Sequence, residues 1–385
     1  MATNVINIRE FVDVTTSVAA TPVNVARDWG ALLFVQKGSN GATTTITTYD
    51  SLEALLAAMS NSEAAKAAQV FYGTGYNGVT PRSPITVAVI SASSASDFTT
   101  NFTALLSNEA YYGIVLDTNF TVEMQKAAAA ANEAAQSTTA HMLYLDDHST
   151  DALTKALSAD TASVAAYCRN NNYAHSVVCW SEAANTNKYY SAAMASFFAT
   201  RRFDASSRRM CSIAHKRASG ITPVDLTITV SGNSESPTQR FKHLDEKNCN
   251  VYANIKVVGL PAWERGNLPS GDDVSDFISA DYLNYRVSIS VFQLLQSVPR
   301  LAMNQDGAVL LNNTLVTCLN ELASSGMISG GTALDGDVIP NPGYKINIPI
   351  PTGVARANGL WEGIYCVGLL TGSAKKVVIG NELKK

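Results

Sequence analysis

The densest group of residues capable of acid–base or metal chemistry is His141-Met-Leu-Tyr-Leu-Asp146-Asp147-His148, with two histidines and two aspartates. Imidazoles and carboxylates bind divalent metals, and carboxylates at the carboxyl end of a parallel strand often form α/β active sites. However, His141 begins the expected strand and lies a full strand length from Asp146. The stretch 147–150 also has the pattern of a turn that caps a following helix. We therefore predict no metal site, and a cytoplasmic α/β metal-dependent enzyme remains the less favoured alternative.

A second candidate is Gly73-Thr-Gly-Tyr-Asn-Gly78, which has the glycine spacing of a dinucleotide-binding loop. That chemistry requires a strand before the glycines and a helix after them, so that the helix N-terminus faces the pyrophosphate. Here the apolar spacing predicts a helix before the glycines, and Pro81 and Pro84 prevent a helix after them. We therefore predict an ordinary loop and no cofactor.

Basic residues gather in the pairs Arg201-Arg202, Arg208-Arg209 and Lys216-Arg217, with Asp204 as the opposing charge. A nucleic-acid site would need aromatic residues to stack on bases, and Phe203 is the aromatic residue available here. A solvated face, or an ion-pairing surface for an acidic partner protein, fits the cluster better. The sequence also lacks the nucleophile elbow, the phosphate-binding loop and the zinc-protease motif, so we predict no catalytic residues.

The composition favours a structural protein over a nucleic-acid binder. The net charge is −4, whereas a general nucleic-acid binder usually carries a clear basic excess. Charged residues make up 16% of the chain, against a typical value of about 25%. A sparsely charged surface costs less to desolvate, which suits a protein whose outside becomes interface. The scattered cysteines, such as Cys168, Cys179 and Cys318, fit buried thiols in a reducing cytoplasm. Neither a signal peptide nor a membrane-spanning run is expected.

Short buried strands alternate with longer helices between residues 31 and 214. This pattern predicts a layered α/β domain with a mainly parallel sheet. One long helix is expected over residues 151–168. Strands are expected at 31–36, 85–90, 111–116, 141–145 and 176–179.

Strand-like segments also occur near both ends of the chain. Ile6, Ile8, Val12 and Val14 alternate with mostly polar residues, and a Thr-rich stretch ending at Pro22 follows them. A lone strand needs a sheet edge, which its own chain or another copy could supply. After two helices expected at 280–297 and 307–325, further strands are expected at 344–350, 363–370 and 377–379.

A series of short segments between residues 111 and 330 carries a family resemblance. These segments are Tyr111-Tyr-Gly-Ile-Val-Leu-Asp117, Phe197-Phe-Ala-Thr-Arg-Arg-Phe203, Arg240-Phe-Lys-His-Leu244, Lys247-Asn-Cys-Asn-Val-Tyr-Ala-Asn254, Glu264-Arg-Gly-Asn-Leu-Pro-Ser-Gly271, Asp276-Phe-Ile278, Asp281-Tyr-Leu283, Val291-Phe-Gln-Leu-Leu295 and Gly326-Met-Ile-Ser-Gly330. In the expected order, they resemble a family of contractile phage (myovirus) tail sheath proteins of the shorter form. One departure is the 299–306 turn, where the family has a more polar sequence, and residues before 80 match loosely.

The resemblance implies a structural subunit that polymerises as a helix of stacked rings around a tail tube and contracts to drive the tube through the host envelope. The implied partners are further copies of the chain, the tube, the baseplate and the terminator, with no direct contact to nucleic acid or membrane. The protein would lie in the virion tail after assembly in the host bacterial cytoplasm. Another tail or baseplate component is an alternative.

The resemblance also implies a division of the chain. Residues 1–22 would form an N-terminal strand arm and linker, and 361–385 a C-terminal strand arm. Residues 23–35 and 221–360 would form a tube-facing α+β core, and 36–220 the outer α/β domain. Each arm would add a strand to a sheet in a neighbouring subunit. The residues expected to carry these inter-subunit strands are Ile6, Ile8, Val12, Val14, Ile364, Val367, Val377 and Ile379.

Overall fold

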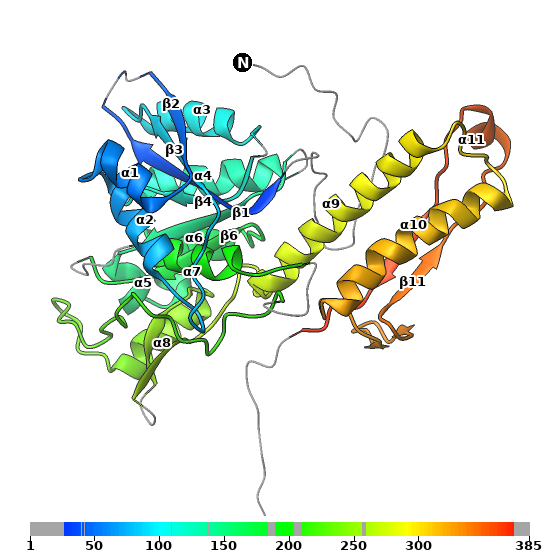
Figure 1. Cartoon of the computed structure of the whole chain (residues 1–385). Coiled ribbons are helices and arrows are strands. Elements are labelled where there is room, and N and C mark those ends of the chain that lie inside the picture. Colours follow the sequence, from blue (N-terminus) through cyan, green and yellow to red (C-terminus); the bar gives the residue numbers. More distant parts are fainter. Residues whose placement is uncertain are drawn as a thin grey trace, which may run out of the picture.

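The computed structural model describes residues 27–39, 41, 43–108, 110–136, 139–183, 189–203, 209–255 and 259–372. The larger part of the molecule, called the body here, is built on a six-stranded sheet in the order β2-β3-β1-β4-β5-β6 (Figure 1). Strand β2 pairs antiparallel with β3, and the other pairings are parallel. The predicted layered α/β domain with a mainly parallel sheet is therefore confirmed. The strands are β1 (Asp28–Lys37), β2 (Thr45–Tyr49), β3 (Ile85–Ile90), β4 (Tyr111–Leu116), β5 (Met142–Asp147) and β6 (Ser176–Trp180).

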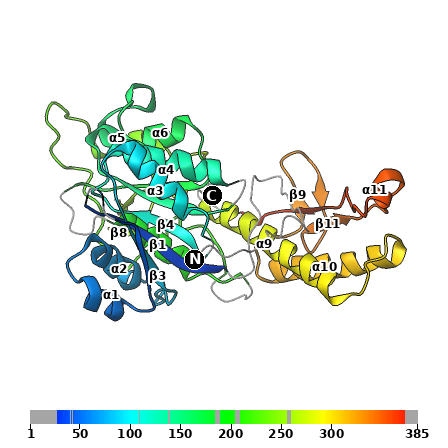
Figure 2. The same cartoon turned by 90° about the horizontal axis from the view of Figure 1, so that it is seen from above.

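Helices cover both faces of this sheet. On one face α2 (Glu63–Gly73) contacts α1 (Leu52–Met59) and α7 (Tyr190–Ala199), and on the other α4 (Val122–Ala135) contacts α3 (Ala95–Leu105) and α6 (Val164–Asn170) (Figure 2). Five of these helices begin at a hydroxyl side chain that accepts a hydrogen bond from a backbone N–H three residues later. The capping residues are Ser51, Ser62, Ser94, Thr121 and Ser163.

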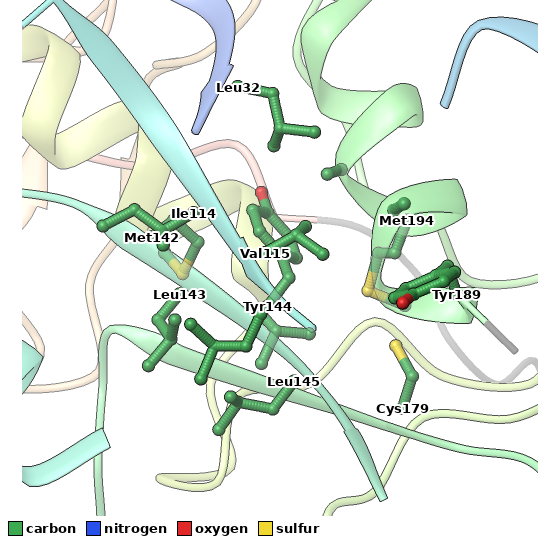
Figure 3. Close-up of a cluster of buried hydrophobic side chains, with 14 of the residues drawn as sticks. Leu32, Ile114, Val115, Met142, Leu143, Tyr144, Leu145, Cys179, Tyr189 and Met194 are labelled. Atoms are coloured by element: carbon green, nitrogen blue, oxygen red, sulfur yellow. The ribbon is translucent and has the colours of Figure 1, made fainter. Parts of the chain in front are cut away.

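The core of the body lies between the sheet and these helices. Figure 3 shows Leu32 of β1, Val115 of β4 and Tyr144 of β5 converging toward Met194 of α7. All four side chains are buried, and they belong to one continuous hydrophobic cluster. The predicted burial of Cys168, Cys179 and Cys318 is also confirmed.

The prediction of one helix over residues 151–168 is wrong. The chain forms α5 (Thr150–Thr154), a 3-10 turn (Leu157–Ala159) and then α6. Asp160 explains the break, because its carboxylate accepts hydrogen bonds from the backbone N–H of Ala162 at 3.1 Å and of Ser163 at 3.0 Å. Side chains that bond to their own backbone in this way compete with a continuous helix.

Strand β1 crosses the boundary that we predict between residues 35 and 36. Leu32 pairs with Ile85 of β3 and also with Gly113 of β4, and the pairing with β3 continues to Lys37. Residues 28–35 are therefore part of the sheet of the body. The sequence pattern could not reveal this, because a short apolar strand has the same pattern in either domain.

Residues 209–278 continue the body beyond β6. They contain α8 (Pro237–Glu246), β7 (Tyr252–Ile255) and β8 (Leu260–Trp263). The N–H of Trp180 donates to the carbonyl of Asn250 at 2.9 Å, and the N–H of Asn250 donates to the carbonyl of Val178 at 2.8 Å. These two bonds extend the ladder past β6, and the following residues Val251 and Tyr252 join the same core.

The long helix α9 (Val274–Ser297) leads from the body to a C-terminal lobe, defined here as residues 289–372 (Figure 1). Phe277 and Ile278 near its start are buried in the core of the body. Farther along, α9 packs against α10 (Gln305–Ser324), and Arg286 donates to both carboxylate oxygens of Glu321 at 2.8 and 2.7 Å. The lobe also contains β9 (Gly331–Thr332), β10 (Val338–Ile339), β11 (Tyr344–Asn347), α11 (Gly353–Ala357) and β12 (Tyr365–Gly368).

Candidate functional site

The carboxylates at the end of β5 have structural partners. Asp147 accepts hydrogen bonds from the backbone N–H of Ser149 and of Ala165, each at 2.9 Å, and so fixes the starts of two helices. Asp146 accepts a hydrogen bond at 2.9 Å from the N–H of Ser191, near the start of α7, and another from the hydroxyl of the same serine. Burial raises the pKa of Asp146 to about 6. Hydrogen bonds from backbone N–H groups and from the Ser191 hydroxyl therefore account for the carboxylate oxygens of both aspartates.

The two histidines of the same motif lie at opposite ends of β5. His141 is buried, its Nδ1 is 3.0 Å from the guanidinium of Arg27, and its Nε2 is 3.0 Å from the carbonyl of Leu106. Burial and the Arg27 charge lower the pKa of His141 to about 3, so the ring is neutral. Arginine can only donate, which makes Nδ1 the acceptor and places the proton on Nε2. His148 instead contacts Ser181 at 3.1 Å. Within the described ranges, no three His, Cys, Asp or Glu side chains are grouped as metal ligands.

The glycine motif forms a loop, as predicted. Helix α2 ends at Gly73, and the N–H of Gly75 donates to the carbonyl of Ser219 at 3.1 Å. Tyr76 and Val79 then close a tight turn through two mutual backbone bonds of 3.0 and 3.1 Å. No helix N-terminus follows the glycines, so the geometry of a dinucleotide site is missing from this described stretch.

The basic pairs are partly described. Arg201 packs over the ring of Phe197, with 4.4 Å between the guanidinium carbon and the ring centroid, and its Nη2 donates to the Thr200 hydroxyl at 2.9 Å. Arg208 and Asp204 lie outside the described residues. An ion-pairing surface for an acidic partner stays a prediction.

Substituting Asp147 tests the capping role directly. Asp147→Ala is expected to lower the free energy of unfolding by about 2 kcal/mol, because two backbone N–H groups lose their acceptor. Urea denaturation would measure this loss. The matched control is Asp151→Ala, which removes an exposed i,i+4 pair with Lys155 and should cost no more than about 0.5 kcal/mol. Equal losses in the two variants would contradict the capping role, and loss of a bound metal without loss of stability would favour the enzyme alternative.

The lobe carries most of the exposed apolar side chains of the described chain. Leu334 is 110% exposed relative to a reference leucine, and Val354 is 77% exposed. Charged side chains are sparse on the lobe as well, and from residue 287 to 320 they are Arg300 and Asp306. A lobe with many exposed apolar side chains and little charge favours a surface that another protein covers. The lobe members of the exposed apolar set are Leu295, Val309, Leu310, Leu334, Val338, Ile350, Val354, Leu360 and Tyr365, against Ile46, Val122 and Leu260 elsewhere.

The β11–β12 hairpin offers backbone groups for a further strand. The N–H of Leu369 donates to the carbonyl of Gly343, immediately before the first pair of the hairpin register. Hydrogen-bonded and non-bonded pairs alternate in antiparallel ladders. The backbone groups of Tyr344, Ile346 and Cys366 therefore point to the outer edges, and the described residues form no further strand there.

The predicted arm residues divide into two groups. Val367 lies in β12 opposite Lys345 of the same chain, and Ile364 lies half-buried just before this strand. In the single chain these two residues therefore belong to the hairpin itself. The others lie outside the described residues: Ile6, Ile8, Val12, Val14, Val377 and Ile379.

Sequence reasoning did not find the apolar surface of the lobe. The sequence signal that could have found it is the low fraction of charged residues after residue 286, which the composition of the whole chain does not reveal.

Among the described residues, no helix is both long and apolar enough to cross a membrane.

Neither a protein-family model nor a curated protein sequence matches the chain. Solved structures do match over nearly the whole length. A chain of the anti-feeding prophage helical sheath in its contracted state has a TM-score of 0.60 at 14% identity and covers 100% of this chain and 99% of its own. A chain of the sheath complex of an extracellular contractile injection system, PVC, in its contracted state has a TM-score of 0.59 at 12% identity, with 97% and 96% covered.

A chain of the anti-feeding prophage baseplate also matches, with a TM-score of 0.59 at 16% identity and coverage of 97% and 98%. Body, long connecting helix and lobe are thus all included in the similarity. The chain has the fold of the sheath proteins of contractile injection systems.

Proposed function

We propose that this chain is a structural subunit of a contractile sheath, which polymerises as a helix around a rigid tube and contracts to drive that tube through a target envelope. The observation that carries the proposal is the match to a contracted helical sheath over 100% of this chain and 99% of the other. A similarity that includes both the body and the lobe supports a shared assembly, rather than a shared domain with another use. The exposed apolar side chains of the lobe support the same proposal, because a helical lattice would cover them.

In the mechanism that we propose, the hairpin β11–β12 accepts strands from neighbouring subunits. Its outer edges present the backbone groups of Tyr344, Ile346 and Cys366, which an added strand can pair with. The N-terminal arm, with Ile6, Ile8, Val12 and Val14, would supply one strand. A C-terminal segment after the hairpin, with Val377 and Ile379, would supply another.

Strand exchange would keep the subunits linked while they move. The Thr-rich stretch before Pro22 would act as a linker, so that the body can rotate while the strand stays paired. The extended sheath would then be metastable, and contraction would proceed because the contracted lattice has more favourable contacts. In this arrangement the lobe lies toward the tube and the α/β domain lies outside.

A second candidate is a baseplate or other tail component, which the match to a baseplate chain favours specifically. Both candidates fit the fold, but they differ in the assembly formed. Only the sheath subunit would polymerise without limit along one axis. A sheath subunit and a baseplate component could each belong to a phage tail or to a related injection system.

Electron microscopy of the purified protein separates the two candidates. A sheath subunit should form long hollow tubes of uniform diameter, because every copy presents the same surfaces to the next. Small discrete rings would favour the baseplate component. A protein that stays monomeric at high concentration and at every salt concentration tested would contradict both.

A further inference from the structure

A groove lies where the body meets the C-terminal end of α10. It has a volume of about 550 Å³, and its lining includes the apolar residues Ala323, Ile328 and Pro342, which we call its apolar floor. The polar residues of the lining include Arg209, Ser324 and Asn341, which we call its rim. The rim contains no carboxylate, so a ligand for this groove would combine an apolar group with a negative charge.

Arg209 supplies the positive charge of this groove. Its guanidinium lies against Gly326, where an added Cβ would come within 2.4 Å of Nη1. The side chain belongs to an exposed residue, and no ion pair within the described residues holds it. A cation next to the last turn of α10 is favoured by the helix dipole, and an anionic group that enters the groove would meet this charge.

The same lobe presents a knob with the complementary chemistry. It is the turn between β9 and β10, where Leu334 is 110% exposed and Asp335 is also exposed. The turn is closed by a backbone hydrogen bond, in which the N–H of Ala333 donates to the carbonyl of Asp337 at 2.8 Å. The carboxylate of Asp337 is paired with Lys345 at 2.6 Å. The carboxylate of Asp335, next to Leu334, accepts a hydrogen bond from the N–H of Asp337 at 3.0 Å. Because the backbone of the turn is already constrained, binding costs less conformational entropy than it would for an open loop.

The knob cannot enter the groove of its own chain. Asn341, at the base of the β9–β10 hairpin, is part of the rim of the groove, and in Figure 2 the hairpin projects from the lobe on the side away from α10. We infer that the Leu334–Asp335 turn of one copy inserts into the groove of a second copy, with Leu334 on the apolar floor and Asp335 facing Arg209. This inference rests on the proposed function, for which it names one contact between subunits.

The contact has a direction. Knob and groove are different surfaces of the same chain, so the interface is heterologous and repeats head to tail. Such a contact generates an open helix or a closed ring, and a two-fold dimer would not use it. A helical sheath needs contacts of this type, because all of its subunits point the same way along the tube.

Cysteine cross-linking tests the contact without requiring tubes. Leu334→Cys protein is mixed with Ser324→Cys protein under mild oxidation, and a disulfide between the two variants is expected, since the two Cα atoms would come within about 7 Å. The matched control mixes Val354→Cys, which replaces another exposed side chain of the lobe, with Ser324→Cys. A Leu334→Cys yield no higher than that of the control overturns the inference.

Charge reversal gives an independent measurement on the full chain. Arg209→Glu and Asp335→Lys should each reduce this cross-link, and the double variant should restore it, because the opposite charges again face each other. Leu334→Ser should raise the concentration needed for assembly about tenfold, the factor expected for losing one buried leucine. A double variant that stays as weak as the single variants overturns the inference. If the cross-link forms but the protein assembles only into small oligomers and not into tubes, the contact is supported and the proposed sheath function is contradicted.

Discussion

Deleting residues 2–18 should abolish polymerisation and leave a folded monomer. The deleted segment contains the alternating Ile6, Ile8, Val12 and Val14, and a strand of this kind can contribute only where it finds a sheet edge. The described body begins at Arg27, and its described residues form one continuous hydrophobic core. Sedimentation velocity should therefore show monomers at concentrations where the full chain forms tubes, and the melting temperature of the monomer should change little.

A finer variant separates strand pairing from mere chain length. Ile8→Pro with Val12→Pro removes two backbone donors and should reproduce the assembly defect, because proline cannot join the interior of a ladder. The matched control is Asn7→Ser with Asp13→Ser, which changes the alternate positions and keeps every N–H. Normal tubes from the deletion protein, or from the double proline variant, would contradict strand exchange by this arm.

Raising the pH from about 6.5 to about 9 should weaken the attachment of α9 to the body. His175, which precedes β6, is 1% exposed and lies between two carboxylates. Its Nδ1 is 3.7 Å from Glu133 of α4, and its Nε2 is 3.7 Å from Asp281 of α9. The hydroxyl of Tyr112 donates to the other oxygen of Asp281 at 2.6 Å, and the ring of Phe277 packs edge-on against the imidazole. At these distances the imidazole contacts are ion pairs without direct hydrogen bonds.

The direction of the pH effect follows from the pKa of His175. Burial by itself would lower that pKa, but Asp281 and Glu133 outweigh it and raise the pKa from 6.5 to about 9. The folded state therefore binds the proton more tightly than the unfolded state does. The resulting stabilisation is complete below pH 6.5 and is lost as the pH rises through 9. A shift of this size corresponds to about 3 kcal/mol in the free energy of unfolding.

Urea denaturation across this pH range would measure the effect, with His175→Gln as the control. Buried thiols and other groups also titrate at high pH, so the informative quantity is the difference between the two proteins. We expect the stability of the unsubstituted chain to fall toward that of His175→Gln as the pH approaches and passes 9. If the free energies of unfolding of the two proteins differ by the same amount from pH 6.5 to 9.5, His175 carries no stabilising charge.

Local patterns predicted most of the body. The segments at 85–90 and 111–116 are mostly apolar, and they form strands where expected, as β3 and β4. The sequence did not predict strand β2, because residues 45–48 are exposed and mostly threonine. Only its pairing with β3 in the structure identifies it as a strand. The helix expected at 151–168 failed for a local reason, because Asp160 and Ser163 bond to nearby backbone groups.

The candidate surface was less predictable than the fold. Alternation of apolar residues predicted strands near both ends of the chain, and β11 confirms one of them at Tyr344–Asn347. The sequence did not predict the pairing partners of these strands. The reason is that β12 has the same apolar pattern whether it pairs within its own chain or with another copy. The exposure of Leu334 was equally hidden, since a leucine in a turn gives no indication of what covers it.

By itself the sequence determined the class of the fold, the loop nature of the glycine motif and the order of segments that resembles a sheath protein. These follow from hydrophobic period, turn chemistry and order along the chain, all of which act between near neighbours. Only the tertiary structure decided that β1 lies in the centre of the sheet, that Glu133, His175 and Asp281 meet, and that the lobe holds both a groove and an exposed knob. Those features join residues far apart in the chain, and their partners are selected by packing and charge in three dimensions, which no local pattern encodes.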